Sequence, residues 1–185
     1  MGRRLSADDW ITAGMTLLSK EGESALTLER LCRFTGKTRG SFYHHFDSME
    51  VYIEALLTQW RRSHTESIIA LAEEEVDPKG RLDRLEREVA QVDHRLDQII
   101  RRWADYQPRA KTALAAVDET RVDYIARCLR GLGIEEAQAQ VFAELEYLMF
   151  LGAQQWAGSL GSERSALLQR TYREIMRAPL KGSES

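Results

Sequence analysis

The sequence predicts an all-α protein, and three observations support that fold class. Apolar residues recur at steps of three and four along most of the 185 residues, as amphipathic helices require. The strict alternation of a half-buried strand is absent, and only three prolines interrupt the chain. The pattern divides into about nine helices. We expect an N-terminal three-helix domain with a helix-turn-helix at residues 1–47 and a helical bundle at residues 48–185.

The composition is that of an ordinary soluble globular protein, with 43% hydrophobic and 30% charged residues. The net charge of −3 excludes a general polycation, so any affinity for nucleic acid must come from a local basic patch. No apolar run approaches the length of a membrane span, and we expect a cytoplasmic protein that does not bind membranes. Cys32 and Cys128 fall on apolar helix faces and are interpreted as core residues, although a redox-sensing role stays open.

The first helix is expected from Ala7 to Lys20, with Ser6 or Asp8 as its N-cap. Its buried face is formed by Trp10, Ile11, Gly14, Leu17 and Leu18. A glycine within a helix costs about 1 kcal/mol relative to alanine. We therefore expect Gly14 to allow another helix to cross closely.

Residues 27–46 predict two short helices joined by a tight turn. Thr27 is placed to cap the first helix, and Gly36 suits the left-handed residue that ends it. Thr38 can then cap the second helix, which buries Phe42 and Phe46. The apolar face of the first helix consists of Leu28, Leu31, Cys32 and Thr35. Two helices joined in this way form a helix-turn-helix.

The polar residues of the second helix are suited to a DNA groove. From Arg30 to His45 there are four cations and no acid. The planar donors of Arg39 can pair with guanine, and Gly40 lets the backbone approach a partner closely. A solvated basic face is the simpler alternative. The predicted DNA-binding residues are Thr27, Lys37, Thr38, Arg39, Gly40, Ser41, Tyr43, His44 and His45, with Arg39 on a base and Thr27, Thr38, Ser41, Tyr43 and His45 on phosphates.

Residues 36–46, Gly-Lys-Thr-Arg-Gly-Ser-Phe-Tyr-His-His-Phe, resemble the recognition segment of the tetracycline-repressor-type (TetR family) regulators. That family's pattern is close to Gly-Val-Ser-Lys-Gly-Thr-Leu-Tyr-His-His-Phe. Residues 10–22 resemble its first helix and residues 47–57 the start of its fourth. Two positions depart from the family pattern, Lys37 where an apolar residue is usual and Met49 where a lysine is usual. The resemblance implies a homodimer formed by the last two helices, and a basic arm at Arg3 and Arg4 that can touch DNA.

The rest of the chain predicts a bundle. A helix from Ser48 to about Glu74 begins with a capping box at Asp47 and Glu50, and residues 77–80 break the chain. One long helix is expected to carry the heptad-spaced seam Leu82, Leu85, Val89, Val92, Leu96, Ile99 and Trp103. Helices at about 109–116, 118–132, 135–160 and 163–177 follow.

Two further sites are expected in this bundle. Aromatic residues could line a cavity for a small apolar or aromatic effector, and the candidates are Trp60, Trp103, Tyr106 and Tyr147. Simple core packing would explain most of these residues as well. The last two helices carry surplus apolar surface, and the expected dimer contacts are Phe142, Leu145, Met149, Trp156, Leu168, Tyr172 and Ile175.

Motifs for catalysis and metal binding are missing from the sequence. There is no Gly-rich phosphate loop, no zinc spacing of cysteines and no Glu-x-x-His pair. We therefore expect no enzyme activity, no cofactor and no metal. The sequence indicates a homodimeric transcriptional regulator, a repressor by family resemblance, that leaves a near-palindromic double-stranded DNA operator when an effector binds. Two alternatives stay open: a helical scaffold that docks an acidic protein, and a DNA-binding dimer without a small ligand.

Overall fold

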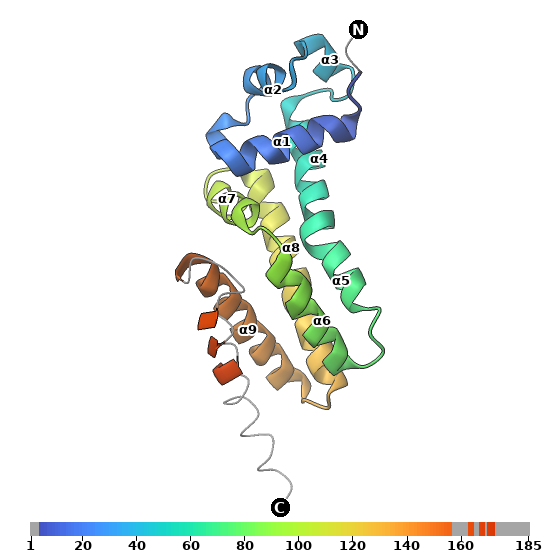
Figure 1. The fold of residues 1–185 in the computed structure, drawn as a ribbon, viewed down its shortest axis with the longest axis vertical. Coiled ribbons are helices and arrows are strands. Elements are labelled where there is room, and N and C mark those ends of the chain that lie inside the picture. Colours follow the sequence, from blue (N-terminus) through green and yellow to red (C-terminus); the bar gives the residue numbers. More distant parts are fainter. Residues whose placement is uncertain (1–3, 157–162, 165–166, 169, 173–185) are drawn as a thin grey trace, which may run out of the picture.

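A computed structural model describes residues 4–156, 163–164, 167–168 and 170–172, and within these residues the regular structure is entirely helical. Figure 1 shows an elongated molecule with α1, α2 and α3 gathered at one end, next to the N-terminus. The α4–α5 run and α8 descend from that end, and α6 and α9 lie beside them. The predicted fold class is confirmed.

The N-terminal helices have the predicted caps. Helix α1 (Ala7–Glu21) begins at Ser6, which forms a capping box with Asp9. A short 3₁₀ turn (Glu23–Ala25) leads to α2 (Leu28–Thr35), whose N-cap Thr27 accepts from the Arg30 N–H at 3.2 Å. Gly36 ends α2 with a φ of 65°, a left-handed conformation that is free of strain only for glycine. Thr38 then caps α3 (Arg39–Tyr43).

The fourth helical run differs from its prediction in two details. Its N-cap is Ser48, whose hydroxyl accepts from the Val51 N–H at 3.3 Å, so the capping box predicted at Asp47 and Glu50 was wrong. The run is continuous, but it consists of α4 (Met49–Arg61), a π-helical segment (Arg62–Glu66) and α5 (Ser67–Ala72). A π-helical turn inside an α-helix often marks a functional position.

The single helix predicted over the heptad seam was wrong. Asp77 caps α6 (Pro78–Gln91), Val92 adopts an extended conformation, and α7 (Arg95–Trp103) begins after His94. Leu82 and Leu85 pack against small clusters with α8, whereas Leu96, Ile99 and Trp103 belong to the main core. One apolar period thus serves the main core and two small clusters, which periodicity by itself cannot distinguish.

The second half of the bundle is simpler than predicted. Residues 108–131 form one helix, α8 (Pro108–Gly131), where two short helices were expected. Helix α9 (Glu136–Trp156) runs along α8, as Figure 1 shows. Of the final predicted helix, the described residues among 163–172 are helical, and the remainder lies outside the described residues.

The largest buried cluster crosses the predicted domain boundary at residues 47 and 48. It includes Trp10 and Leu17 of α1, Phe42 of α3, and Ile100 and Trp103 of α7. The Tyr52 hydroxyl of α4 donates to the Trp10 carbonyl oxygen at 2.8 Å inside this cluster. The N-terminal helices are therefore packed directly on the bundle: α1 contacts α4 and α7, and Phe42 of α3 packs against Tyr52 of α4.

The close crossing expected at Gly14 gives the first testable prediction. A Cβ added at Gly14 would lie 1.9 Å from the Tyr52 Oη, so Gly14→Ala must displace the Tyr52 ring. We expect a loss of about 1–3 kcal/mol in the free energy of unfolding, measured by chemical denaturation. Gly40→Ala is the matched control, because the nearest atom to its Cβ would be the Thr38 Oγ1 at 3.8 Å. Equal stability of the two variants would contradict this account.

Candidate nucleic-acid interface and ligand cavity

The residues predicted to contact DNA share one exposed segment. Thr27, Thr38, Arg39, Gly40, Tyr43 and His44 are exposed, and Lys37, Ser41 and His45 are half-buried. Phe42 holds this segment in place, because its fully buried ring packs edge-on against Trp10 at 5.5 Å and against Tyr52 at 5.2 Å. The structure thus places eight of the nine residues on α3 and the residues flanking it, and Thr27 at the start of α2.

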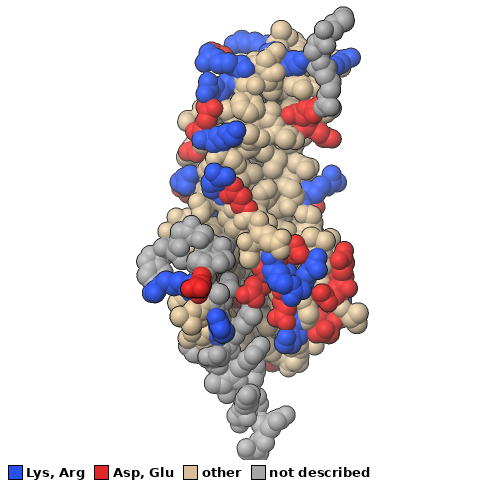
Figure 2. Space-filling model, viewed as in Figure 1, with Lys and Arg blue, Asp and Glu red and all other residues tan. Residues whose placement is uncertain are grey.

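Arg39 differs from the two arginines of α2. Arg30 donates to Glu21 at 2.9 Å, and Arg33 donates to Glu29 at 2.9 Å. Arg39 makes no hydrogen bond or ion pair with any residue that the structure describes, so its five donors can meet a partner. Figure 2 shows Lys and Arg side chains along the end of the molecule that holds α2 and α3. This end supplies the local basic patch that an acidic protein needs for DNA binding.

The two histidines of the segment have different surroundings. The Arg4 guanidinium donates to the His44 Nε2, which fastens the basic arm beside α3. The His45 Nε2 is buried and has no hydrogen-bond partner among the described residues. His44 is therefore the more accessible of the two for a phosphate.

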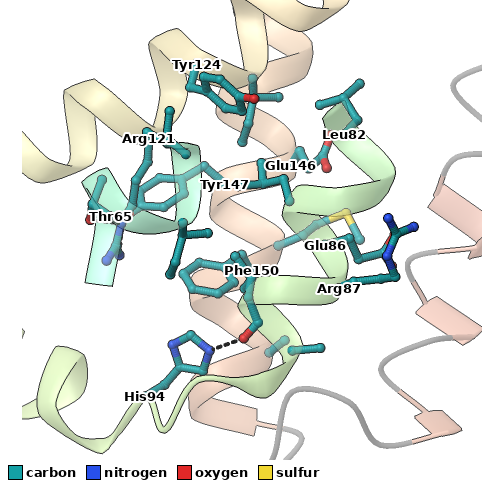
Figure 3. A pocket seen from close by; sticks show the side chains of 18 of the residues that line it. Thr65, Leu82, Glu86, Arg87, His94, Arg121, Tyr124, Glu146, Tyr147 and Phe150 are labelled. Carbon is teal, nitrogen blue, oxygen red and sulfur yellow. Dashed lines mark hydrogen bonds between the residues drawn. The ribbon is translucent and has the colours of Figure 1, made fainter. Parts of the chain in front are cut away.

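A cavity of about 630 Å³ lies in the bundle, between the α4–α5 run and helices α6, α8 and α9 (Figure 3). Its walls are mostly apolar, and its polar residues come from several elements. The described lining consists of His64, Thr65, Ile68, Ile69, Leu82, Leu85, Glu86, Arg87, Val89, Ala90, His94, Arg121, Tyr124, Ile125, Glu146, Tyr147, Met149, Phe150, Gly152, Ala153, Leu168 and Tyr172. A mostly apolar cavity with a few polar groups is typical of small-molecule sites.

Of the four aromatic residues predicted for a ligand site, Tyr147 lines this cavity. Trp60 and Trp103 lie instead in the main core, and Tyr106 is 64% exposed at the end of α7. The aromatic character of a residue does not predict whether it packs in the main core or lines the cavity. The sequence analysis missed His64, His94 and Arg121, because two single histidines and one arginine on separate helices form no motif.

A buried ion pair stands beside the cavity. The Arg121 guanidinium of α8 donates to the Asp97 carboxylate of α7 at 2.7 Å, and the two side chains are only 13% and 6% exposed. Arg121 also donates to the Thr65 hydroxyl and to the His64 carbonyl oxygen, each at 3.0 Å. These two acceptors belong to the π-helical segment, so Arg121 ties α8 and α7 to the end of α4.

The network extends to α9 through Tyr147. The Tyr147 hydroxyl donates to Asp118 at 2.6 Å, and Arg101 donates to Asp118 at 2.7 Å and to the Tyr147 oxygen at 3.2 Å. Burial raises the pKa of Tyr147 to about 12, so the phenol stays protonated at neutral pH. Two arginines and two aspartates thus balance in charge next to the cavity, and one tyrosine of its wall joins their hydrogen bonds, while the Asp97 Oδ2 is buried without a partner among the described residues.

The predicted dimer residues are divided between the surface and the cavity wall. Leu145 and Leu168 are exposed. Met149 and Tyr172 line the cavity, and Leu168 lines it as well. Phe142 is half-buried, and its carbonyl oxygen accepts from the Tyr172 hydroxyl at 3.1 Å. The Trp156 side chain and Ile175 lie outside the described residues. Val141, Leu145 and Leu148 share one exposed face of α9 at steps of four and three.

The buried ion pair gives the second prediction. Asp97→Asn keeps the shape of the side chain but leaves the Arg121 charge without a buried counter-charge. We expect a loss of about 3 kcal/mol in the free energy of unfolding, measured by urea denaturation. Asp93→Asn is the control, because the Asp93–Arg95 pair is exposed and solvent screens it, so the denaturation midpoint should stay unchanged. A similar midpoint for both variants would show that the buried pair does not stabilise the fold.

Comparisons with known proteins agree with this geometry. Residues 11–56 match the family described as "Bacterial regulatory proteins, tetR family". A search of curated proteins finds no match. In the described part of the chain, no helix combines the length and apolarity needed to cross a membrane.

Solved structures show the same fold over most of the chain. The reduced form of NemR from E. coli has a TM-score of 0.71 at 17% identity, over 82% of this chain and 87% of that one. A TetR-family transcriptional regulator from Agrobacterium tumefaciens has a TM-score of 0.69 at 20% identity, over 86% and 90%. A TetR transcriptional regulator from Legionella pneumophila has a TM-score of 0.71 at 14% identity, over 95% and 99%. Residues 11–56 thus resemble the tetR family of bacterial regulatory proteins, and the chain shares its fold with these solved structures.

Proposed function

We propose that this protein is a homodimeric repressor that binds a near-palindromic DNA operator and is released from it by a small apolar or aromatic effector. The observation that carries the proposal is the exposed α3 segment, in which Arg39 presents unengaged donors on a rigid support. A recognition helix of this type enters the major groove. The accessible hydroxyl and imidazole groups around Arg39 are suited to the flanking phosphates.

The dimer is proposed to form through α9 and the described helical residues that follow it. Val141, Leu145 and Leu148 expose a continuous apolar face, and Leu167 adds apolar surface on the last helical segment. Such a face is usually covered in a soluble protein. A two-fold dimer would present two α3 segments, and half-sites about one DNA turn, ~34 Å, apart would accommodate them.

The route from effector to DNA is proposed to run through the π-helical segment and α4. The cavity touches His64 and Thr65 of that segment, and α4 continues directly to the helix-turn-helix. An effector that binds better to a state with a different α4 position would reduce the population able to bind DNA. The cavity favours this mechanism over a dimer without a small ligand.

The third prediction tests the base-reading role of Arg39. Arg39→Ala should weaken binding to the operator by about 1–3 kcal/mol and relax the sequence preference at one position in each half-site. The measurement is a binding titration on the DNA that flanks the coding region, over a series of salt concentrations. Random DNA of equal length gives the nonspecific reference.

Arg130→Ala is the matched control for charge. Arg130 lies in the last turn of α8, at the opposite end of the molecule from α3 (Figure 1). This variant should bind like the unmodified protein. If Arg39→Ala weakened binding equally on all sequences, Arg39 would be a phosphate contact. If both variants and all DNA sequences behaved alike, the protein would instead fit the scaffold alternative.

The fourth prediction concerns the dimer. Leu148 is 62% exposed, the largest value on the α9 face, and two-fold symmetry would place a Leu148→Glu charge in the interface twice. We expect this variant to elute as a monomer in size-exclusion chromatography with light scattering, and to lose operator binding. Val76→Glu is the control, because Val76 is 93% exposed in the turn before α6. A dimeric Leu148→Glu protein would exclude this face as the interface.

A further inference from the structure

Two histidines line the cavity, and their hydrogen bonds indicate which ring nitrogens accept. The Ser63 hydroxyl lies 2.8 Å from the Gln59 carbonyl oxygen and 3.3 Å from the Trp60 carbonyl oxygen, and both can only accept. We therefore assign the proton of the 2.9 Å contact between Ser63 and His64 to the His64 Nδ1. The His64 Nε2 therefore carries a lone pair. Burial lowers the pKa of His64 below its usual value of 6.5, which outweighs the attraction of nearby Asp97. His64 is neutral at pH 7, and its Nε2 is an acceptor.

His94 offers an acceptor nitrogen through a different contact. Its Nε2 lies 2.8 Å from the Val89 carbonyl oxygen, which can only accept, so the Nε2 carries a proton. The Nδ1 is then the ring nitrogen left to accept, and it is buried without a hydrogen-bond partner among the described residues. A buried acceptor without a partner costs free energy until a donor reaches it. Figure 3 shows the His94 ring at one end of the cavity, with its bond to the Val89 carbonyl drawn.

Three donor side chains of the cavity wall are engaged within the protein, whereas the Tyr124 hydroxyl, at the opposite end of the cavity from His94 in Figure 3, is buried without a hydrogen-bond partner among the described residues. Tyr147 donates to Asp118, and Tyr172 donates to the Phe142 carbonyl oxygen. The Nε and one terminal nitrogen of Arg121 donate to Thr65, to the His64 carbonyl oxygen and to Asp97. This part of the wall therefore offers acceptors to a ligand, and its charges are already paired.

The other residues of the cavity wall determine what kind of molecular body the ligand can have. Leu82, Leu85, Ile125 and Phe150 supply apolar wall, and the Phe150 ring packs edge-on against His94 at 5.3 Å. Arg87, Glu86 and Glu146 also line the cavity; Arg87 lies 3.7 Å from Glu75, and both glutamates interact with other residues of the chain. A volume of about 630 Å³ falls in the range of drug-sized ligands.

We propose that the cavity binds an uncharged molecule with an aromatic body and a hydroxyl or N–H group, which donates hydrogen bonds to the His64 Nε2 and the His94 Nδ1. An anionic ligand would face the lone pairs of both histidines, and the Arg121 charge in the cavity wall is already paired with Asp97. A molecule of the same shape without a donor would leave the histidine acceptors unpaired, and such sites discriminate strongly against it. The role of this molecule as the effector rests on the proposed function, whereas its binding can be measured without DNA.

The test uses three probes that share a biphenyl body. 4-Phenylphenol carries a donor, 4-methoxybiphenyl has an acceptor only, and biphenyl-4-carboxylate is an anion. Isothermal titration calorimetry of the purified protein at neutral pH, without DNA, gives the three dissociation constants. We expect 4-phenylphenol to bind about tenfold or more tightly than the ether, and the carboxylate to bind most weakly.

His64→Phe and His94→Phe identify the acceptors, because phenylalanine is close to histidine in shape but has no ring nitrogen. Each variant should reduce the preference for 4-phenylphenol over 4-methoxybiphenyl, while affinity for the ether stays within about threefold of the unmodified protein. Thermal unfolding of each variant verifies that it is folded. Ile68→Val is the control for a small change in the apolar wall, and the preference should persist.

The unmodified protein alone is sufficient to overturn the proposal, so a variant that fails to fold does not affect the conclusion. Equal affinity for the phenol and the ether, or tighter binding of the carboxylate, would overturn it. A preference that persists in both histidine variants would overturn the assignment of the acceptors. Operator binding is measured separately, so failure here leaves the DNA-binding proposal intact, and failure to bind DNA leaves the ligand class intact.

Discussion

The buried Arg121–Asp97 pair is the interaction on which the arrangement of the bundle depends. A guanidinium removed from water requires acceptors in its plane, and the chain supplies them from three elements: Asp97 of α7, and Thr65 and the His64 carbonyl oxygen of the π-helical segment. The π-helical segment interrupts the regular α-helical hydrogen bonds at the position where Arg121 binds, which is consistent with the need of the guanidinium for acceptors. One buried charge thus fixes how α4, α7 and α8 meet, and Tyr147 adds α9.

The same network forms one side of the cavity and lies on the path to the helix-turn-helix. Helix α7 contributes Asp97 to the ion pair, and it contributes Ile100 and Trp103 to the core that contains Trp10 and Phe42. Closely packed interiors have few intermediate arrangements, so this shared core is the route by which the proposed effector response would reach α1 and α3. The cavity network and the helix that carries Arg39 thus share the core to which α7 contributes.

Local sequence signals predicted the DNA-binding end because its structure depends on short-range physics. Thr27, Gly36 and Thr38 act on the backbone within four residues, and the structure places each cap as predicted. The break after Gln91 was missed, because Val92 keeps the apolar period while its backbone turns away from the helix. The two helices predicted at residues 109–132 are one, because weakly apolar positions in α8 are supported by packing against neighbouring helices.

By itself the sequence determined the all-helical class, the caps and the recognition segment, since periodicity and capping act over a few residues. Only the tertiary structure decided which buried residues share a cavity. Trp60 and Trp103 have the same apolar character as Phe150, yet the packing of helices places the first two in the main core and Phe150 in the cavity wall. His64, His94 and Arg121 are far apart in sequence, and they become one site because three helices and the π-helical segment meet there.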